Sequence, residues 1–466
     1  MAQIPSRPAP RIEALQKFYC GLNVDDIPKP AVILDVAVSR RHCNALLSAV
    51  EDIGVDFRAH VKTHKTPQLA RLQVGDKSPE ARFIVSTLAE IEHLLPMFKE
   101  IQAEGRQVNI LYGIPLPPSQ TRRLAHLARE LGPGSICVLL DHVTQFGCLE
   151  SFFEIAGFPA GIYIKIDTGY HRAGLPPNAL NKHGLLERLA QLEKDGRATF
   201  VGIYSHNSLG YNDNTAAQAM MNLEAEIKGC MDALHANESF FPSDKDITIS
   251  VGASPQVVSI RNLQEPDASD LNGARRLSEM IRRTASGKTR PFRTRLELHA
   301  GVYAVFDMQQ MATRPMASLG DWEDEVAVSV VAEVCSVYND GERRQPEALL
   351  AVGTLGLGRE PCPSYAGWAV VSQKNSSRQS LTGKRRLVVE RISQEHSIVS
   401  WEVTTAEDNK GFELPPIPLE IGETVRLVPN HACVTGAMYG WYLIVDSEKD
   451  PSASKIVDVW TRASGW

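Results

Sequence analysis

The sequence has no long hydrophobic run, no excess of one charge sign and no closely spaced cysteine pair. None of its apolar runs approaches the roughly 18 residues that a membrane helix needs, so we expect no transmembrane span. The first residues, MAQIPSRPAPRIEALQK, lack the apolar stretch of a secretory signal. A net charge of −6 over 466 residues gives no strong attraction to nucleic acid or to anionic membranes. These absences predict a soluble protein of the cytoplasm.

The cysteines are few for the length and widely scattered. No two of them form a C-x-x-C pair, and a disulfide scaffold is expected only in small secreted domains. We therefore expect reduced thiols at all eight positions. These are Cys20, Cys43, Cys137, Cys148, Cys230, Cys335, Cys362 and Cys433. The chain is 43% hydrophobic and 22% charged, an ordinary globular composition with room for two or three domains.

The first half of the chain alternates short β-branched runs with amphipathic helical segments. Eight such alternations over roughly 240 residues are the expected size of a parallel (β/α)8 barrel. A doubly wound sheet gives a similar pattern, so the alternation establishes the α/β class and favours the TIM-type barrel. The predicted strands are Phe57–Val61, Arg82–Ser86, Val108–Tyr112, Ile136–Leu140, Ile162–Asp167, Thr199–Ser205, Ile247–Val251 and Arg295–Leu298.

The pattern changes at both ends of the barrel region. After about residue 310, short β-rich runs alternate with Gly, Pro and Asn clusters, which is typical of antiparallel sheets. We predict an N-terminal extension over residues 1–30 that associates with the β domain, a barrel over 31–310 and a β-rich domain over 311–466. Within the barrel, residues 262–292 are rich in Lys and Arg and are expected to form an exposed insertion without a function of its own.

Polar residues follow several of the predicted strands. Barrel enzymes carry their catalytic groups at the carboxyl ends of the strands, and Lys62 stands there in AHVKTHK. Desolvation at such a position lowers the pKa of a lysine and makes its amine nucleophilic, although a solvated basic loop explains the motif equally well. Arg172 in KIDTGYHRAGL is a fixed cation after the fifth strand. His206 and Tyr211 follow the sixth strand.

The last two strand ends indicate a phosphate site. SVGASP offers backbone N–H groups and a hydroxyl at Gly252 and Ser254. LELHAGVYAVFD then adds Tyr303 and Asp307 on the same face, and loops after the seventh and eighth strands often bind phosphate in barrels. Each feature is weak alone, but their order on successive strand ends is specific.

That order resembles the fold-type III pyridoxal phosphate (PLP) enzymes, which are alanine racemase-like barrels followed by a β domain. More narrowly, AHVKTHK, KIDTGYHRAGL, GVYAVFD and PNHACVTGAMY resemble the D-serine dehydratase and D-threonine aldolase group, over roughly residues 28–445. The resemblance implies a covalent link from Lys62 to PLP, with the released amine serving as the base, and a homodimer. Arg172 would contact the phenolic oxygen of PLP, His206 would lie close to its ring, and Tyr211 would face its pyridine nitrogen. The residues that would hold its phosphate are Gly252, Ser254 and Tyr303.

The β domain contains a possible metal site at His431 and Cys433. Two ligands are fewer than the four of a structural zinc site, and from the residues alone a buried cysteine beside a turn histidine is the favoured explanation of the pair. The resemblance implies zinc there, with open positions for water and substrate. A thiolate and an imidazole suit zinc better than magnesium or manganese. Glu395 and His396 resemble another element of these enzymes and are expected to have a supporting role.

The resemblance predicts a carbon–oxygen lyase, a zinc-assisted D-serine dehydratase that forms pyruvate and ammonia and also accepts D-threonine. The first alternative is a D-threonine aldolase, whose group has an oxygen ligand at the position of Cys433. A racemase needs a second base opposite the lysine, for which Tyr365 is the one candidate. The third alternative, a non-catalytic PLP-homeostasis protein, is usually a barrel alone. The expected partners are a small D-amino acid and a second copy of the chain, with no nucleic acid or membrane.

Overall fold

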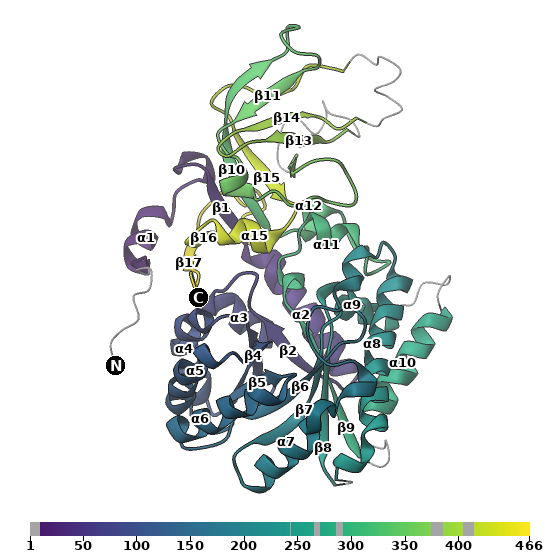
Figure 1. The fold of residues 1–466 in the computed structure, drawn as a ribbon. Helices are drawn as coiled ribbons and strands as arrows, with labels where there is room; N and C mark the ends of the chain where they lie inside the picture. Colours follow the sequence, from purple (N-terminus) through teal and green to yellow (C-terminus); the bar gives the residue numbers. More distant parts are fainter. Residues whose placement is uncertain (1–9, 243, 265–270, 286–291, 374–384, 404–413) are drawn as a thin grey trace. The chain divides into compact units, whose positions relative to one another are not determined.

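The computed structural model describes residues 10–242, 244–264, 271–285, 292–373, 385–403 and 414–466. The chain forms two compact units (Figure 1). The barrel unit contains residues 43–303, 313–318 and 463–466. The β unit contains residues 1–42, 304–312 and 319–462. No helix within the described ranges is long and apolar enough to cross a membrane, and all eight cysteines are free thiols.

Eight parallel strands, β2 to β9, close into a barrel in chain order, which confirms the predicted fold class (Figure 1). Each predicted strand agrees with an observed one to within a few residues. Every residue of β5 and β6 is buried, as expected for strands covered on both faces. The strands are β2 (Asp56–His60), β3 (Glu80–Val85), β4 (Gln107–Pro115), β5 (Ile136–Leu140), β6 (Gly161–Ile166), β7 (Thr199–Ser205), β8 (Asp246–Val251) and β9 (Arg293–Ala300).

The longer helices beside these strands bury an apolar stripe. In α5, Leu124, Ala128 and Leu131 are buried as the helical pattern predicts, and the helix ends at Gly132, which has a φ of +89°. The α-helices are α2 (Val36–Asp52), α3 (Pro67–Val74), α4 (Leu88–Ala103), α5 (Pro118–Leu131), α6 (Phe146–Ala156), α7 (Leu185–Lys194), α8 (Ala216–Ala236), α9 (Ser254–Val258) and α10 (Leu271–Ala285). Short 3-10 helices are η2 (Val143–Gln145), η3 (Pro177–Ala179), η4 (Lys182–Gly184), η5 (Ser208–Asn212), η6 (Glu238–Phe240), η7 (Ser259–Leu263) and η8 (Val302–Ala304).

The structure differs from the exposed insertion expected at 262–292. Residues 271–285 form α10, whose Leu277 and Ile281 are buried and which packs against α8 and β9. Its arginines, Arg275, Arg276, Arg282 and Arg283, are exposed, so the segment rich in basic residues is an amphipathic helix of the barrel unit. Residues 265–270 and 286–291 of the predicted insertion lie outside the described residues.

The β unit is built on a nine-stranded sheet in the order β11-β14-β13-β12-β15-β10-β1-β16-β17. β10 also pairs with β11, so the six strands from β11 to β10 close on themselves. Its strands are β1 (Ala31–Asp35), β10 (Val328–Tyr338), β11 (Glu347–Leu350), β12 (Ala369–Val371), β13 (Leu387–Ile392), β14 (Ser397–Trp401), β15 (Thr424–Pro429), β16 (Trp441–Val445) and β17 (Asp458–Thr461). Its helices are α1 (Ile12–Tyr19), η1 (Val24–Asp26), α11 (Met308–Ala312), α12 (Trp322–Glu325), α13 (Thr354–Leu357) and α15 (Ala432–Ala437).

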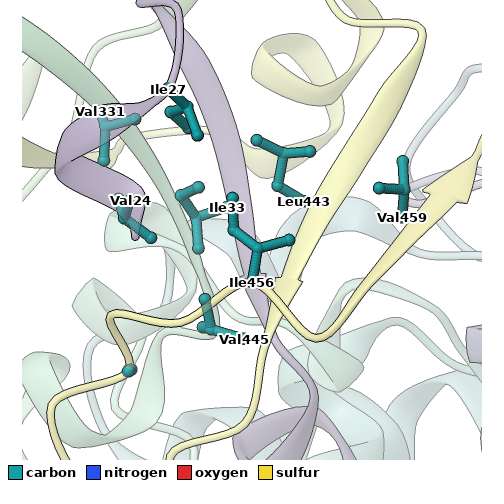
Figure 2. Close-up of a cluster of buried hydrophobic side chains, with 9 residues drawn as sticks. Val24, Ile27, Ile33, Val331, Leu443, Val445, Ile456 and Val459 are labelled. Atoms are coloured by element: carbon teal, nitrogen blue, oxygen red, sulfur yellow. The ribbon is translucent and has the colours of Figure 1, made fainter. Parts of the chain in front are cut away.

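The N-terminal segment is part of the β unit. β1 pairs antiparallel with β10 and parallel with β16, so the strand after the predicted boundary at residue 31 lies in this sheet. Val24, Ile27 and Ile33 form one buried cluster with residues of β10, β16 and β17 (Figure 2). Because burial of each such side chain contributes about 1.5–3 kcal/mol, the extension adds substantially to the core. The boundaries at 1–30, 31–310 and 311–466 stay a prediction.

Candidate active site

The turn after β2 carries two lysines with different surroundings. Lys62 is half-buried, and its backbone N–H donates to Nδ1 of His60 at 3.4 Å. Lys65 has a left-handed backbone, and its Nζ forms an ion pair with the buried carboxylate of Glu90 at 3.0 Å. Lys65 is therefore engaged in the structure of the turn, and Lys62 is the better candidate for chemistry.

Three histidines stand at or near strand ends of the barrel. Nδ1 of His206 donates to the carbonyl of Gly252 at 2.7 Å, and its Nε2 lies 3.1 Å from the Ser208 hydroxyl. The ring of His299 stacks on Tyr204 at 4.4 Å and lies 5.8 Å from the ring of His206. Nε2 of His299 is buried and has no hydrogen-bond partner in the part of the chain that the structure describes. His60, on β2, is the third.

These imidazoles are neutral, and the charge around them is positive. Burial and then the charge of Lys62 lower the pKa of both His60 and His206, and Arg172 acts in the same direction. Burial also lowers the pKa of Lys165, at the end of β6, to about 8. Cations beside neutral imidazoles and an unpartnered buried nitrogen fit an anionic aromatic ligand such as PLP.

The loop after β8 is built for close approach of backbone. Gly252 has φ +135°, and a Cβ there would lie 2.5 Å from Cγ2 of Val257 and 2.7 Å from the His299 carbonyl oxygen. This position therefore requires glycine. The Ser254 hydroxyl accepts the N–H groups of Gly301 at 3.3 Å and of Tyr303 at 3.2 Å, which joins the loops after β8 and β9.

The side chain of Tyr303 is buried. Its ring contacts Phe57 edge-on at 5.8 Å, and its hydroxyl is buried near Cys43. Burial raises the pKa of this hydroxyl well above its usual range. The backbone N–H of Tyr303 already donates to the Ser254 hydroxyl, and the phosphate contact expected of Tyr303 stays a prediction.

Arg172 and Tyr211 lie in the loops after β6 and β7. The Arg172 guanidinium is exposed and lies 5.3 Å from the ring of Tyr170. The Asp167 carboxylate organises this turn by accepting the N–H groups of Gly169 at 3.0 Å and His171 at 2.9 Å. Tyr211 is half-buried in η5.

In the β unit, His431 precedes α15 and Cys433 lies in its first turn. Burial opposes protonation of the imidazole, but the hydrogen bond and charge of Cys433, and then Asp307 and Glu360, raise the pKa of His431 to about 9. Nδ1 of His431 has no hydrogen-bond partner among the described residues and lies 3.9 Å from a carboxylate oxygen of Glu360. An imidazole and a thiol beside carboxylates fit a cation, although no three such side chains in the described ranges are arranged to hold a metal ion by themselves.

Asp307 belongs to this His–Cys turn and not to the barrel face on which the sequence pattern placed it. One carboxylate oxygen of Asp307 accepts the N–H of Ala432, between the two candidate ligands, at 2.8 Å. The other accepts the N–H of Gln310 at 2.8 Å. Asp307 is 1% exposed, so the contact is shielded from water.

Asn430, which directly precedes His431, also stabilises the turn that carries His431 and Cys433. Its side-chain amide donates to the carbonyls of Glu360 and Gly367, both at 2.8 Å. Tyr365 donates its hydroxyl to Asn430, and burial raises the pKa of that hydroxyl far above its usual range. Tyr365 is therefore a structural donor and a poor base.

Glu395 and His396 are exposed in the turn between β13 and β14.

Sequence reasoning missed several polar groups of the barrel. His60 and Lys165 stand inside the recognised motifs and were detectable there. Glu226 and Gln256 are fully buried, yet they occupy helices whose sequences look ordinary. Within the described ranges, neither polar atom of the Gln256 side chain has a hydrogen-bond partner.

Comparison with known proteins matches a family model to each part of the chain, and both models agree with the family that the sequence motifs resemble. A family model of the alanine racemase N-terminal domain matches residues 35–264, and one of a putative serine dehydratase domain matches residues 327–445. D-serine dehydratase of Schizosaccharomyces pombe is 31% identical over 97% of this chain and 96% of its own. D-serine dehydratase of Saccharomyces cerevisiae is 28% identical over 96% of this chain and 98% of its own.

The solved structure of D-threo-3-hydroxyaspartate dehydratase from Delftia sp. HT23 has the same fold. It is 23% identical, with a TM-score of 0.68 over 96% of this chain and 100% of that one. The expected enzyme class, a carbon–oxygen lyase, is confirmed by the relatives. The chain belongs to the D-serine dehydratase and D-threonine aldolase group of fold-type III PLP enzymes.

Proposed function

We propose that the protein is a PLP- and zinc-dependent D-serine dehydratase that converts D-serine to pyruvate and ammonia. The observation that carries the proposal is that one chain holds two kinds of site. The barrel unit has cationic side chains beside neutral imidazoles, and the β unit has His431 and Cys433 beside carboxylates. The relatives named D-serine dehydratase over nearly the full length support the substrate.

PLP, when bound, draws electrons away from the amino acid Cα and so makes its proton removable. Lys62 would hold the cofactor through its amine and then, released, take the Cα proton. Arg172 would balance the phenolic oxygen, and neutral His206, fixed by the Gly252 carbonyl, would lie along the ring. Gly252, Ser254 and Tyr303 would hold the phosphate, with Tyr211 toward the pyridine nitrogen.

Zinc, when bound, acts as a Lewis acid on a hydroxyl oxygen and so makes hydroxide a better leaving group. His431 and Cys433 would supply its nitrogen and sulfur ligands, and Asp307 and Glu360 would fix and balance them. A solved cysteine-to-alanine variant of a D-threo-3-hydroxyaspartate dehydratase is a metal-free form, which supports the role given to Cys433.

A D-threonine aldolase is the second candidate because a solved enzyme of that name has a TM-score of 0.67 to this chain at 18% identity. The thiol of Cys433 favours dehydration. The decisive experiment incubates the purified holoenzyme with D-serine, D-threonine or D-threo-3-hydroxyaspartate, with and without chelator. Keto acid and ammonia support the proposal, whereas glycine and an aldehyde from D-threonine would replace it with the aldolase.

We propose that the enzyme is a homodimer, on the resemblance to this group. Light scattering at micromolar concentration is expected to give twice the chain mass. A fully active monomer would contradict this.

A further inference from the structure

The barrel contains a buried carboxylate that none of the roles above uses. Glu226 lies on α8 and is 0% exposed. One of its oxygens accepts the backbone N–H of Asn207 at 2.7 Å. The Ser205 hydroxyl and the Gly252 amide also stabilise its negative charge.

Those groups belong to the loops proposed to bind the cofactor. Asn207 directly follows His206, and the Gly252 carbonyl receives the His206 Nδ1–H at 2.7 Å. The Ser205 hydroxyl shares a hydrogen bond of 2.8 Å with Thr168, in the loop that carries Arg172. The carboxylate therefore binds the end of β7 directly through the Asn207 N–H. The Gly252 amide at the end of β8 and the Ser205 hydroxyl, which contacts Thr168 after β6, favour its charged form.

A buried carboxylate needs compensating charge. Lys165 supplies it from β6, since each of the two groups favours the charged form of the other. Nζ of Lys165 also donates to the Ile166 carbonyl at 3.0 Å and lies 5.3 Å from the centre of the Tyr204 ring, on which His299 stacks. Burial still raises the pKa of Glu226 to about 7, so the ionised carboxylate is costly to maintain. A costly buried charge at a ligand site is expected where it orients other groups.

We propose that Glu226 is a positioning residue of the cofactor site. Its carboxylate fixes the His206 turn and the Gly252 loop in the arrangement that receives the pyridine ring and the phosphate. The inference rests on the PLP site proposed above. Glu226 does not touch the cofactor, and it acts through Asn207, Gly252 and Lys165.

The test is Glu226→Gln in the full-length protein. Glutamine keeps the shape but has one acceptor in place of two and carries no charge, so the Ser205 hydroxyl and the Gly252 amide lose their ionic partner. We expect apoenzyme titrated with PLP to bind about tenfold more weakly or worse, the loss that follows from one charged hydrogen bond. At saturating PLP, the visible circular dichroism per bound cofactor should fall, because the ring is held less rigidly.

Glu193→Gln is the matched control. The Glu193 carboxylate, on α7, accepts the N–H of Phe200 at 2.9 Å, on the same strand β7 but at its opposite end, and it pairs with Lys245. This variant should bind PLP as the wild type does, with unchanged circular dichroism. Equal loss of PLP affinity in both variants would overturn the inference, because the effect would then be general to the barrel.

Three further outcomes are decisive. Wild-type affinity and circular dichroism in Glu226→Gln would overturn the positioning role. If that variant does not fold, Glu226→Asp retains the charge with a shorter reach; it should show an intermediate affinity, and wild-type affinity there would overturn the inference. A wild-type protein that binds no PLP would refute the proposed function instead.

Discussion

Histidine has opposite electrostatic surroundings in the two units. In the barrel unit, burial and the charges of Lys62 and Arg172 lower the pKa of His60 and His206, so both imidazoles are neutral at pH 7. In the β unit, Cys433, Asp307 and Glu360 raise the pKa of His431 to about 9 against the effect of burial. The first environment attracts anions, and the second attracts a cation in place of the proton.

The difference assigns separate tasks to the two units. A cationic pocket with neutral imidazoles can hold a phosphate and stabilise negative charge near Cα. A thiol and an imidazole among carboxylates can hold a metal that assists departure of hydroxide. If this division is correct, variants of one unit should affect cofactor binding and variants of the other should affect metal binding, with little overlap.

The largest effect is expected for Lys62→Ala. Loss of the amine removes both the covalent link to PLP and the proposed base, so the yellow cofactor band and the activity should disappear together. The measurement is the visible spectrum of purified protein with added PLP, followed by a pyruvate assay. Lys65→Ala is the control and should retain the band, because Lys65 is paired with Glu90. An intact band in Lys62→Ala would contradict the assignment.

The second effect is loss of zinc, by chelation or by Cys433→Ala. Removal of a Lewis acid worth several kcal/mol should slow dehydration of D-serine by roughly a thousandfold. The yellow band should survive, since Lys62, Arg172 and the Gly252 loop belong to the other unit. Turnover and zinc content are measured on the same sample. Verified metal-free enzyme with an unchanged rate would eliminate the metal from the mechanism.

The sequence predicted the barrel well because its periodicity is strong and local. Runs such as Ile136–Leu140 lie between amphipathic helices, and their burial follows from composition alone. The segment that contains helix α10 was predicted to be an exposed insertion because the charged residues of the helix outnumber those of its apolar stripe. The pairing of β1 with β10 and β16 depends on contacts far apart in the chain, which no local pattern encodes.

The candidate site was predictable where a residue carries its chemistry in a motif. Lys62, Arg172, His206, His431 and Cys433 were found in this way, and their roles stay a prediction. Asp307 was identified but was predicted to lie with the phosphate-binding strand ends of the barrel. The order of the strands does not show that its carboxylate accepts the N–H of Ala432 in the β unit. Nothing in the sequence around Glu226 indicates that its carboxylate is buried, since an acidic residue on a long helix usually faces solvent.

The third effect concerns the surroundings of the metal and should be smaller. In Asp307→Asn the turn keeps an acceptor for the Ala432 N–H but loses the negative charge beside His431. Outer residues of this kind typically contribute 10- to 100-fold in metal affinity, so we expect zinc to bind weaker by about that factor. Competition with a chromogenic chelator measures it. Asp321→Asn is the control, because Asp321 accepts the Glu323 N–H at the start of α12, at an exposed site of the same unit. Similar zinc affinities in both variants would refute the role of Asp307.

The smallest effect is a pH dependence of zinc affinity, which should change in a variant of the β unit and stay the same in a variant of the barrel unit. Because the pKa of His431 is raised to about 9, its imidazole is protonated at pH 7 in the metal-free protein, and zinc must displace that proton. Zinc affinity should therefore rise with pH up to about 9, by roughly tenfold per unit for each proton released, and become less steep above it. Calorimetric titration with zinc in buffers of different ionisation enthalpy counts the protons. His431→Gln should release about one proton fewer than the wild type, whereas Lys62→Ala should release the same number. An equal number of protons released by the wild type and by His431→Gln would mean that the His431 imidazole is already neutral. The electrostatic difference proposed between the histidines of the two units would then be refuted for the β unit.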